Sequence, residues 1–497
     1  MKNVKQIYLM HGYTKNNSNQ QFCNHVPGYI AFVSFCLLCT CSHLGFITPN
    51  PRYSQMPVTN GQDSLQAPAP VDTSYIENSS DVDFGELIDS LNLAGESDSS
   101  TNAHSPETFS VKTDIVRVAV LQNVQTVTVL SDGVFRVKSS VTAQPLSCSR
   151  INFQYSKKSG ADFVIGVSDK WTKEFVLPCT LTTGNSPWLL RCNNDPYRGI
   201  LIIVSDGNGS FSVVNSLQME EYLRGVVPLE IGKRTESFIE ALKAQAVAAR
   251  TYAYKKIQER TSFSYDMSNT VADQVYGGVK VEDRVTDLAV LATKDLIVVA
   301  DDNIITAYYH STCGGQTASI EQVWDKPACS YLVSVSDLDS MGQAYCVSSP
   351  AFTWQEKWSK SKLNEELLSA LRKAYPQKTF SGAVKGIIID DRLYCGRVKT
   401  CTIKGTHWSI QSGGDKIRFL FRRNSAGAPI LRSSNFTISS FGAHDVIFNG
   451  VGYGHGVGMC QTGALGRALQ HQSFDQILKA YYTGVSIRTA VPVRKYK

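Results

Sequence analysis

The chain has 497 residues, 42% of which are hydrophobic, and a mean hydropathy of -0.14. This composition describes a soluble globular protein with enough apolar material for a large core. The formal net charge is +6, only 19% of the residues are charged, and no RNA- or DNA-binding motif is present, which argues against a nucleic-acid partner.

Residues 1–48 have the pattern of an export signal. Lysines at positions 2, 5 and 15 precede a stretch from Val26 to Thr48 in which His43 is the one residue able to carry a charge. A stretch of about 23 residues can cross a bilayer, and its apolar centre of about 13 residues also fits a signal peptide. We therefore expect a signal peptide or a retained membrane anchor, and a protein exported to the periplasm or cell envelope.

Residues 49–113 are rich in Pro, Ser, Asn and Asp and contain few large apolar residues. We expect them to form a disordered acidic linker that tethers the folded part. Between residues 49 and 114 the acidic residues outnumber the basic ones by nine, which leaves residue 115 onward with a net charge of +12. Such a basic body favours anionic partners, among them cell-wall glycans, acidic polymers and lipid headgroups.

Strand signals begin at Asp114. Runs of β-branched residues flank Ser131-Asp132-Gly133, a sequence typical of a turn, and further strand-like runs cover residues 200–204 and 211–214. These signals predict a strand-rich part over residues 114–218.

The clearest helix follows this part. Ser237 and Glu240 have the spacing of a capping box, and residues 241–258 are dense in good helix formers. Four residues fall on or near one face, and their small size favours close packing against a sheet: Leu242, Ala246, Ala249 and Ala253.

Strand-like runs dominate from Trp324 to Gly450, with a helix expected at residues 363–375. A second capping box, Ser473 to Gln476, begins a last helix that we expect to end near Tyr482, before Gly484. The predicted fold class is α+β, a strand-rich mixed body with a few helices, preceded by the export or anchor segment and the linker.

Nine cysteines follow the export segment, and disulfides are common in exported domains. The spacing leaves several pairings open, and the odd number leaves at least one thiol free. The candidates are Cys395 with Cys401, Cys329 with Cys346, and pairs among Cys148, Cys179 and Cys192.

Two features indicate a functional site. Residues 452–464 contain five glycines, which allow positive φ and close approach of the backbone to a ligand, together with His455 and Gln461. No nucleotide-binding spacing is present, and a tight turn without a ligand is the alternative. Glu230 ends the apolar stretch Val226–Leu229, where loss of solvation would raise its pKa and make it a proton donor near neutral pH. An ordinary surface glutamate is the other interpretation.

Several segments in a fixed order resemble one family. They are the Gly-Val-Val-Pro-Leu-Glu turn at 225–230, the Lys-Ala-Gln-Ala-Val-Ala-Ala-Arg-Thr-Tyr helix at 243–252, His-Ser-Thr-Cys-Gly-Gly at 310–315, the glycine-rich run at 452–464 and Tyr-Arg-Gly at 197–199. Together they resemble the stage II sporulation protein D / LytB (amidase enhancer) family.

The resemblance implies one domain over residues 114–490. Its catalytic part would comprise residues 219–328 and 440–490, with a strand-rich insertion at about 329–440. The implied activity is that of a peptidoglycan lytic transglycosylase, with Glu230 as the single acid and base acting on glycan strands stripped of their stem peptides. A non-catalytic glycan-binding enhancer of a cell-wall amidase is the alternative, and amidase and division or engulfment machinery are partners by analogy.

The resemblance also suggests residues that bind substrate. Arg250 matches the family's helix arginine, although a structural salt bridge would explain it equally well, and Gln274 and Tyr276 match a Gln-x-Tyr-x-Gly segment. The full set of expected substrate-binding residues is Arg250, Gln274, Tyr276, His310, Ser311, His455, Gly456 and Gln461.

The chain departs from the family pattern at three positions. Ile231 replaces a methionine, and Cys313 and Cys460 stand where serine is frequent. These cysteines could form a disulfide, stay free, act as a peptidase nucleophile with His455, or join His310 or His455 around a metal such as zinc. Because no short Cys-x-x-Cys chelate is present, we expect no cofactor, with His310, Cys313 and Cys460 as the weak candidates for a metal site.

Overall fold

A computed structural model describes residues 107–140, 144–158, 160–421 and 430–493. The predicted export segment and most of the predicted linker lie outside these residues. Within these ranges, no helix combines the length and the apolar character needed to cross a bilayer.

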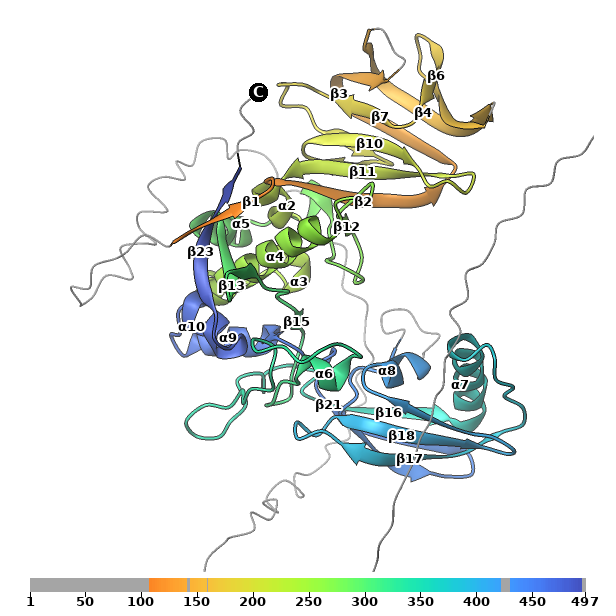
Figure 1. The fold of residues 1–497 in the computed structure, drawn as a ribbon, viewed down its shortest axis with the longest axis vertical. Coiled ribbons are helices and arrows are strands. Elements are labelled where there is room, and N and C mark those ends of the chain that lie inside the picture. The colour runs from red at the N-terminus through yellow and green to blue at the C-terminus, as the bar shows by residue number, and fades with distance from the viewer. Residues whose placement is uncertain (1–106, 141–143, 159, 422–429, 494–497) are drawn as a thin grey trace, which may run out of the picture. The chain divides into compact units, whose positions relative to one another are not determined.

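The α+β prediction is confirmed (Figure 1). Ten strands of residues 115–218 and the later strand β12 form an eleven-stranded sheet. In it β12, β2, β11, β10, β7, β3, β4, β5 and β6 lie in that order, and β8 and β9 extend it beside β3. The strands are β2 (Ile115–Val124), β3 (Thr126–Ser139), β4 (Leu146–Lys158), β5 (Ala161–Val167), β6 (Thr172–Val176), β7 (Cys179–Thr182), β8 (Leu190–Cys192), β9 (Asp195–Tyr197), β10 (Ile200–Ser205), β11 (Phe211–Gln218) and β12 (Met267–Ser268).

Two local predictions in this region are corrected by the structure. Ser131-Asp132-Gly133 does not end a strand, because β3 continues through it and the pairing with β4 shifts register between Leu130 and Phe135. The extra residues form an irregularity within one long strand. The linker also ends earlier than expected, since β1 (Thr108–Val111) pairs in parallel with the last strand, β23 (Ser486–Pro492).

The main core also contains a four-stranded sheet with the order β1, β23, β13, β14, and the long helix α4 packs against its strands β13 and β14. The long helix α4 contacts β13, α5, α9 and α10 (Figure 1), and it is buried on almost every side. The elements are α2 (Met219–Arg224), α3 (Val227–Glu230), the 3-10 helix η2 (Glu236–Phe238), α4 (Ile239–Glu259), the 3-10 helix η3 (Gly278–Val281), α5 (Arg284–Ala292), β13 (Leu296–Ala300), β14 (Asn303–Ile304), α9 (Gln461–Leu469) and α10 (Phe474–Tyr481).

The two predicted capping boxes have different outcomes. The box at Ser473 and Gln476 is present at the start of α10. The one at Ser237 is not, because Ser237 lies within η2 and its hydroxyl bonds to Thr235, 2.8 Å away. The Glu240 carboxylate instead accepts a bond from the backbone N–H of Phe474, 2.7 Å away, so a tertiary contact replaces the local cap.

A second hydrophobic core comprises buried residues between Trp354 and Phe448. Leu332, Ala344 and Cys346 belong to the main core instead, so by packing the inserted region begins later than residue 329. The predicted helix at 363–375 corresponds to α7. The elements of the second core are β16 (Thr353–Ser359), α7 (Lys360–Ala374), β17 (Val384–Arg392), β18 (Val398–Gly405), β19 (Ser409–Gly413), α8 (Lys416–Leu420), β20 (Phe436–Phe441) and β21 (Asp445–Val451), and the short helix α6 (Ile320–Val323) precedes them.

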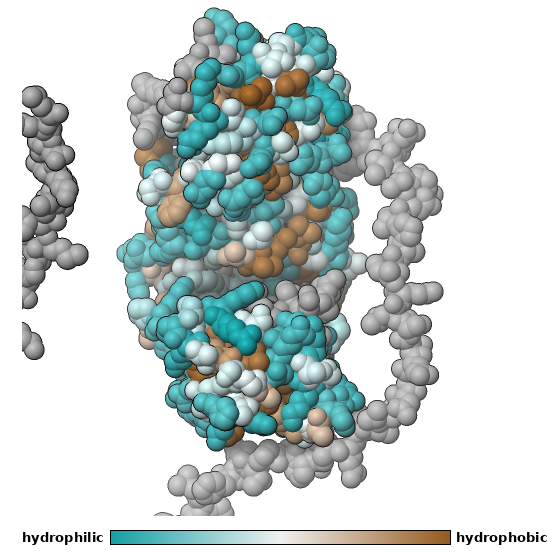
Figure 2. Space-filling view, turned by 90° about the vertical axis from the view of Figure 1, so that its right-hand side faces the viewer, coloured by the Kyte–Doolittle hydropathy of each residue, from teal (hydrophilic) through white to brown (hydrophobic). Residues whose placement is uncertain are grey.

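Burial of apolar side chains in these two cores leaves a polar exterior. Figure 2 shows one face on which hydrophilic residues predominate and hydrophobic ones form separate patches. The expected disulfides are not formed: all nine cysteines of the described ranges are free.

Candidate active site

The predicted motifs meet through a short parallel sheet. In it, β15 (Tyr309–His310) pairs with β22 (Met459–Cys460), so that Tyr309 lies opposite Met459 and His310 opposite Cys460. An isolated bridge between Thr312 and Tyr453 extends the contact. The His-Ser-Thr segment and the glycine-rich run are therefore adjacent in space, with the whole second core inserted between them in sequence.

The glycines of this run let the backbone approach protein rather than an open cleft. Gly458 has φ +72°, and a Cβ there would lie 2.0 Å from the carbonyl oxygen of Tyr308. At Gly454, with φ +102°, a Cβ would lie 2.9 Å from Cβ of His310. Positive φ was predicted correctly, and its use here is to pack the run against residues 308–313.

Glu230 is the last residue of α3, a four-residue helix that contains Pro228 in its first turn. Its side chain is half-buried, and one carboxylate oxygen accepts a bond from the backbone N–H of Val275, 2.8 Å away. Burial raises the pKa of Glu230 to about 7. The Val275 N–H and the side chains of Gln461 and Tyr309 favour the charged form and so limit the rise.

Tyr309 connects Glu230 to a buried hydrogen-bond chain. The amide of Gln274 donates to the Tyr309 hydroxyl, 3.0 Å away, and to the carbonyl of Ala249, 3.2 Å away. The Tyr222 hydroxyl donates to the Gln274 carbonyl oxygen, 2.9 Å away. Gln274, which the sequence singled out, therefore positions the tyrosine beside the acid.

Gln461 reaches Glu230 from the opposite end of the sequence. It begins α9 directly after β22, and its amide donates to the Gln245 side chain of α4, 3.3 Å away. The structure thus brings together Glu230, Gln274 and Gln461, which were predicted, and Tyr309 and Gln245, which were not. The signal for Tyr309 was its place directly before His310 at the start of the His-Ser-Thr segment.

The two predicted histidines belong to an aromatic cluster. Their ring centroids lie 5.5 Å apart, and the His455 ring lies 4.8 Å from that of Trp324 and 6.2 Å from that of Tyr308. Burial lowers the pKa of His455 to about 4 and also lowers that of His310. Both rings are therefore neutral at pH 7. Trp324, Tyr308 and His455 are half-buried and thus partly accessible.

Arg250 lies outside this group. Its side chain has no exposed surface and forms a bidentate ion pair with Glu220, at 2.8 and 2.6 Å, and it also donates to the carbonyls of Leu296 and Val290. These contacts match the alternative interpretation from the sequence, in which Arg250 forms a structural salt bridge. We therefore leave Arg250 out of the candidate site.

Tyr276 is likewise part of the core. It is buried, its hydroxyl donates to Asn215 at 2.7 Å, and its ring centroid lies 5.2 Å from that of Tyr222. It supports the chain of bonds behind the site and does not line a cleft.

Ser311 and Gly456 are next to the site but are tied to protein. The carbonyl of Ser311 accepts a bond from the N–H of Thr462, 3.0 Å away. Gly456 is buried, and a Cβ there would lie 2.4 Å from Nε of Arg397, a side chain of the second core. Arg397 thus fills the space over this glycine.

The cysteine-peptidase interpretation finds no support in this arrangement. Cys313 and Cys460 are fully buried, and burial raises the pKa of both thiols. A nucleophilic thiolate needs access and a lowered pKa. These two residues lie with Asp337 and Cys346 in a separate cluster, of which His310 is not a member.

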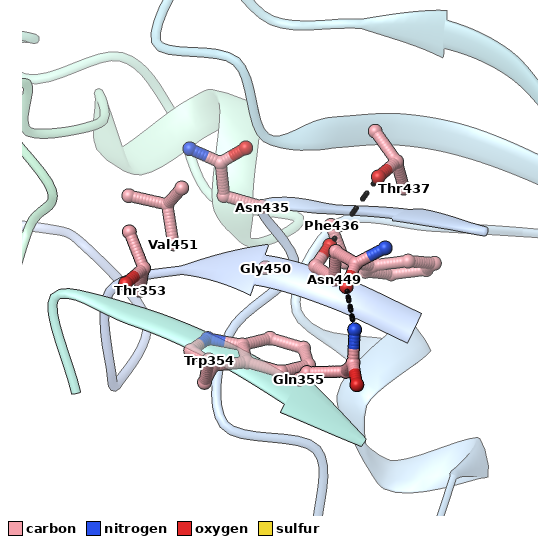
Figure 3. A pocket seen from close by; sticks show the side chains of 9 residues that line it. All are labelled: Thr353, Trp354, Gln355, Asn435, Phe436, Thr437, Asn449, Gly450 and Val451. Atoms are coloured by element: carbon pink, nitrogen blue, oxygen red, sulfur yellow. Dashed lines mark hydrogen bonds between the residues drawn. The ribbon is translucent and has the colours of Figure 1, made fainter. Parts of the chain in front are cut away.

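A pocket of about 490 Å³ opens on the sheet formed by β16, β21 and β20 of the second core (Figure 3), and its lining does not include Glu230. Trp354 and the Gln355–Asn449 hydrogen bond form part of its wall. None of its residues contacts the acid. It is lined by Thr353, Trp354, Gln355, Asn435, Phe436, Thr437, Asn449, Gly450 and Val451.

Comparison with known proteins assigns the segment around Glu230 and the segment that contains the second core to two different family models. A family model described as stage II sporulation protein matches residues 207–299, which include Glu230 and α4. A domain of unknown function matches residues 318–458, which include the second core.

Three relatives are similar over more than half of this chain. An uncharacterised protein of Brachyspira hyodysenteriae is 33% identical over 296 residues, which are 59% of this chain and 73% of that protein. The amidase enhancer of Bacillus subtilis is 32% identical over 53% of this chain, but only 40% of the enhancer is covered. Stage II sporulation protein D of the same organism is 29% identical, with 56% and 76% covered. Together with the motifs around Glu230 and β22, these similarities show that the chain belongs to the stage II sporulation protein D / LytB (amidase enhancer) family.

Proposed function

We propose that this protein is a peptidoglycan lytic transglycosylase, which cleaves the glycan between N-acetylmuramic acid and N-acetylglucosamine with Glu230 as its single acid and base. The observation that carries the proposal is the pKa of Glu230, raised to about 7 by burial while the side chain stays half-buried and oriented by Val275, Tyr309 and Gln461. A carboxyl group in this state can give and take a proton near neutral pH.

The chemistry needs one carboxyl group. Protonated Glu230 donates its proton to the glycosidic oxygen as the bond from that oxygen to C1 of N-acetylmuramic acid breaks. The C6 hydroxyl of the same sugar then forms a bond to C1, and the Glu230 carboxylate takes its proton, which yields a 1,6-anhydro end and returns the acid to its starting state. Because the nucleophile is part of the substrate, it is held close to the reacting carbon.

The surroundings of Glu230 are consistent with a mechanism that needs only one carboxyl group. Ordinary glycosidases use two carboxyl groups. Among the residues that the structure describes, the groups that shift the pKa of Glu230 are a backbone N–H, an amide and a phenol, with no second carboxylate. Tyr309 and Gln461 are placed to orient the acid, and the partly accessible rings of Tyr308, Trp324 and His455 offer a surface on which a sugar could stack.

The direct test uses purified peptide-free glycan strands and mass spectrometry of the products. We expect Glu230→Gln to reduce the release of anhydro-ended fragments by at least about a hundredfold, since amide cannot supply the proton. Glu236→Gln is the matched control, because Glu236 is an exposed carboxylate on η2. Undiminished release by Glu230→Gln would contradict the proposal.

The second candidate function is a non-catalytic enhancer of a cell-wall amidase, favoured by the similarity to the amidase enhancer of Bacillus subtilis. The same site would then hold glycan without cleaving it. In that case Glu230→Gln would still stimulate an amidase on intact peptidoglycan, and the wild-type protein would release no anhydro fragments.

The remaining parts of the proposal concern location and partners. We propose export to the periplasm or cell envelope, through an N-terminal segment that would also supply a membrane attachment if it is retained. An amidase that strips stem peptides would provide the substrate, and division or engulfment machinery would provide the context. The proposed reaction uses no cofactor.

A further inference from the structure

Three cysteines and an aspartate meet in the main core outside the contacts of Glu230. Cys313 follows β15, Cys460 ends β22, and Asp337 and Cys346 come from the segment between α6 and β16. All four side chains are buried, and their ligand atoms lie within 4.8 Å of one another. Sequence regions far apart in the chain thus place four metal-ligating groups around one point.

The spacing of these atoms fits one tetrahedral metal ion. The Cys313 sulfur lies 3.1 Å from an Asp337 oxygen and 3.6 Å from the Cys346 sulfur. Tetrahedral zinc with Zn–S bonds of about 2.3 Å places its ligands about 3.8 Å apart. A disulfide requires sulfurs about 2.05 Å apart, and all three cysteines are free.

The two oxygens of Asp337 have different surroundings. Oδ1 accepts bonds from the Tyr481 hydroxyl at 2.8 Å and from the Arg467 guanidinium at 3.1 Å, while Oδ2 faces the Cys313 sulfur. One oxygen is therefore held by outer partners and the other is directed at the sulfurs. Ligating carboxylates in metal sites are commonly oriented in this way, and the Arg467 cation offsets part of the negative charge.

Backbone N–H groups point at the sulfurs as well. Those of Cys313 and Gly463 each lie 3.2 Å from the Cys460 sulfur, and that of Gly315 lies 3.3 Å from the Cys313 sulfur. Hydrogen bonds of this kind around a metal site orient its ligands.

We propose that Cys313, Asp337, Cys346 and Cys460 bind one Zn²⁺ ion in a closed structural site. The ion would join the end of β15, the segment around 337–346 and the start of α9. Because Cys460 directly precedes Gln461, the same site would fix the residue that contacts Glu230. This inference stands apart from the catalytic proposal, since metal binding is measured without any glycan.

The ligand set differs from the sequence expectation. His310 was grouped with Cys313 and Cys460, but its Nδ1 lies 3.2 Å from the carbonyl of Val457 and it is not part of the cluster. Cys346 had been paired with Cys329 as a disulfide candidate, and Asp337 had no metal-binding pattern around it. Only the fold brings these two residues to Cys313.

The test measures metal directly. The full-length chain is purified with its thiols reduced, freed of metal by a chelator, and titrated with Zn²⁺ alone. Bound zinc is then measured by inductively coupled plasma mass spectrometry. We expect one equivalent in the wild-type protein and in Cys329→Ser, whose thiol is half-buried and outside the cluster. Cys346→Ser should bind zinc at least about tenfold more weakly.

A second measurement does not depend on the folding of a variant. Wild-type protein loaded with Co²⁺ in place of zinc should show the visible absorption of a tetrahedral cobalt–thiolate centre. The proposal would be overturned by substoichiometric zinc in the reduced wild-type protein, by equal zinc affinity in Cys346→Ser, or by a disulfide between Cys313 and Cys346 in the freshly purified chain.

Discussion

At the scale of single residues, two opposing effects set the proton affinity of Glu230. Burial favours the neutral acid, whereas the Val275 N–H, Gln461 and Tyr309 favour the carboxylate, and the result is a pKa of about 7. An acid catalyst must start protonated. Its usable pH range therefore ends where this group ionises.

Glycan release should accordingly decline on the alkaline side. Above about pH 7 we expect kcat/KM to fall about tenfold per pH unit, because the protonated fraction of Glu230 falls in that proportion. Tyr309→Phe removes a group that stabilises the charged form, so the pKa of Glu230 should rise and the decline should begin about 0.5–1 pH unit higher. The measurement is a pH series of anhydro-fragment release by both proteins.

The matched control for this series is Tyr155→Phe, which removes a hydroxyl bonded to Asp162 in the eleven-stranded sheet. It should leave the pH dependence where it is in the wild-type protein. A profile that stays flat from pH 6 to pH 9, or one that Tyr309→Phe moves to lower pH, would rule out Glu230 as the titrating acid.

Residue-level predictions from the sequence succeeded where one position carried its own chemical signature. Glu230 stood in an apolar stretch, and Gln461 stood in a glycine-rich run, and the structure places both in one site. Trp324 gave no such signal, because an isolated tryptophan is ordinary, and Gln245 lies in the quoted Lys-Ala-Gln-Ala segment but had no feature that set it apart from the rest of its helix. Their roles follow from neighbours that only the fold supplies.

At the scale of elements, the glycine-rich run serves as a packing surface for β15 and the residues around it. Its backbone conformation could be predicted from composition, since a run of glycines at alternate positions favours positive φ. What it packs against could not. The same limit applies to the capping box predicted at Ser237, because the Glu240 carboxylate binds the backbone N–H of Phe474 instead of the start of its own helix. The capping box at Ser473 uses only neighbouring residues and could therefore be predicted.

Substitution at Gly458 tests this packing. Gly458→Ala would place a Cβ 2.0 Å from the Tyr308 carbonyl at a φ of +72°, so we expect a loss of about 2–4 kcal/mol in the free energy of unfolding. Gly386→Ala is the control, because a Cβ there has no atom within 4 Å, and its effect should stay within about 0.5 kcal/mol. Urea denaturation of the two variants gives the comparison, and equal stabilities would refute the packing role.

At the scale of the whole molecule, the site is assembled from segments on both sides of the second core. β15 precedes this core and β22 follows it, and the pairing of β16 with β21 brings the two ends of the insertion together. Strand signals occur on both sides of the boundary, so the sequence alone could not place it. Packing does, since one set of buried residues between Trp354 and Phe448 forms a hydrophobic cluster of its own, whereas Leu393 and Cys395 from the same stretch pack in the main core.

Two separate cores should unfold as two cooperative units. Phe448 is fully buried in the second core, with ring centroids 5.2 Å from Phe421 and 5.5 Å from Phe436. Phe448→Ala should cost about 3–5 kcal/mol there. We expect calorimetry of the full chain to show two unfolding transitions, and Phe448→Ala should lower the midpoint temperature of only one of them.

The matched variant is Phe135→Ala, a fully buried phenylalanine of β3 in the main core. It should lower the midpoint temperature of the main-core transition by a similar amount and leave the midpoint of the second-core transition unchanged. Because Arg397 and Trp354 of the second core bond to the carbonyls of Gly454 and Gly452, unfolding of that core should also release the glycine-rich run. Glycan release by Phe448→Ala should then be lost at the lower of its two transitions, whereas a single transition shifted by both variants would show one cooperative unit.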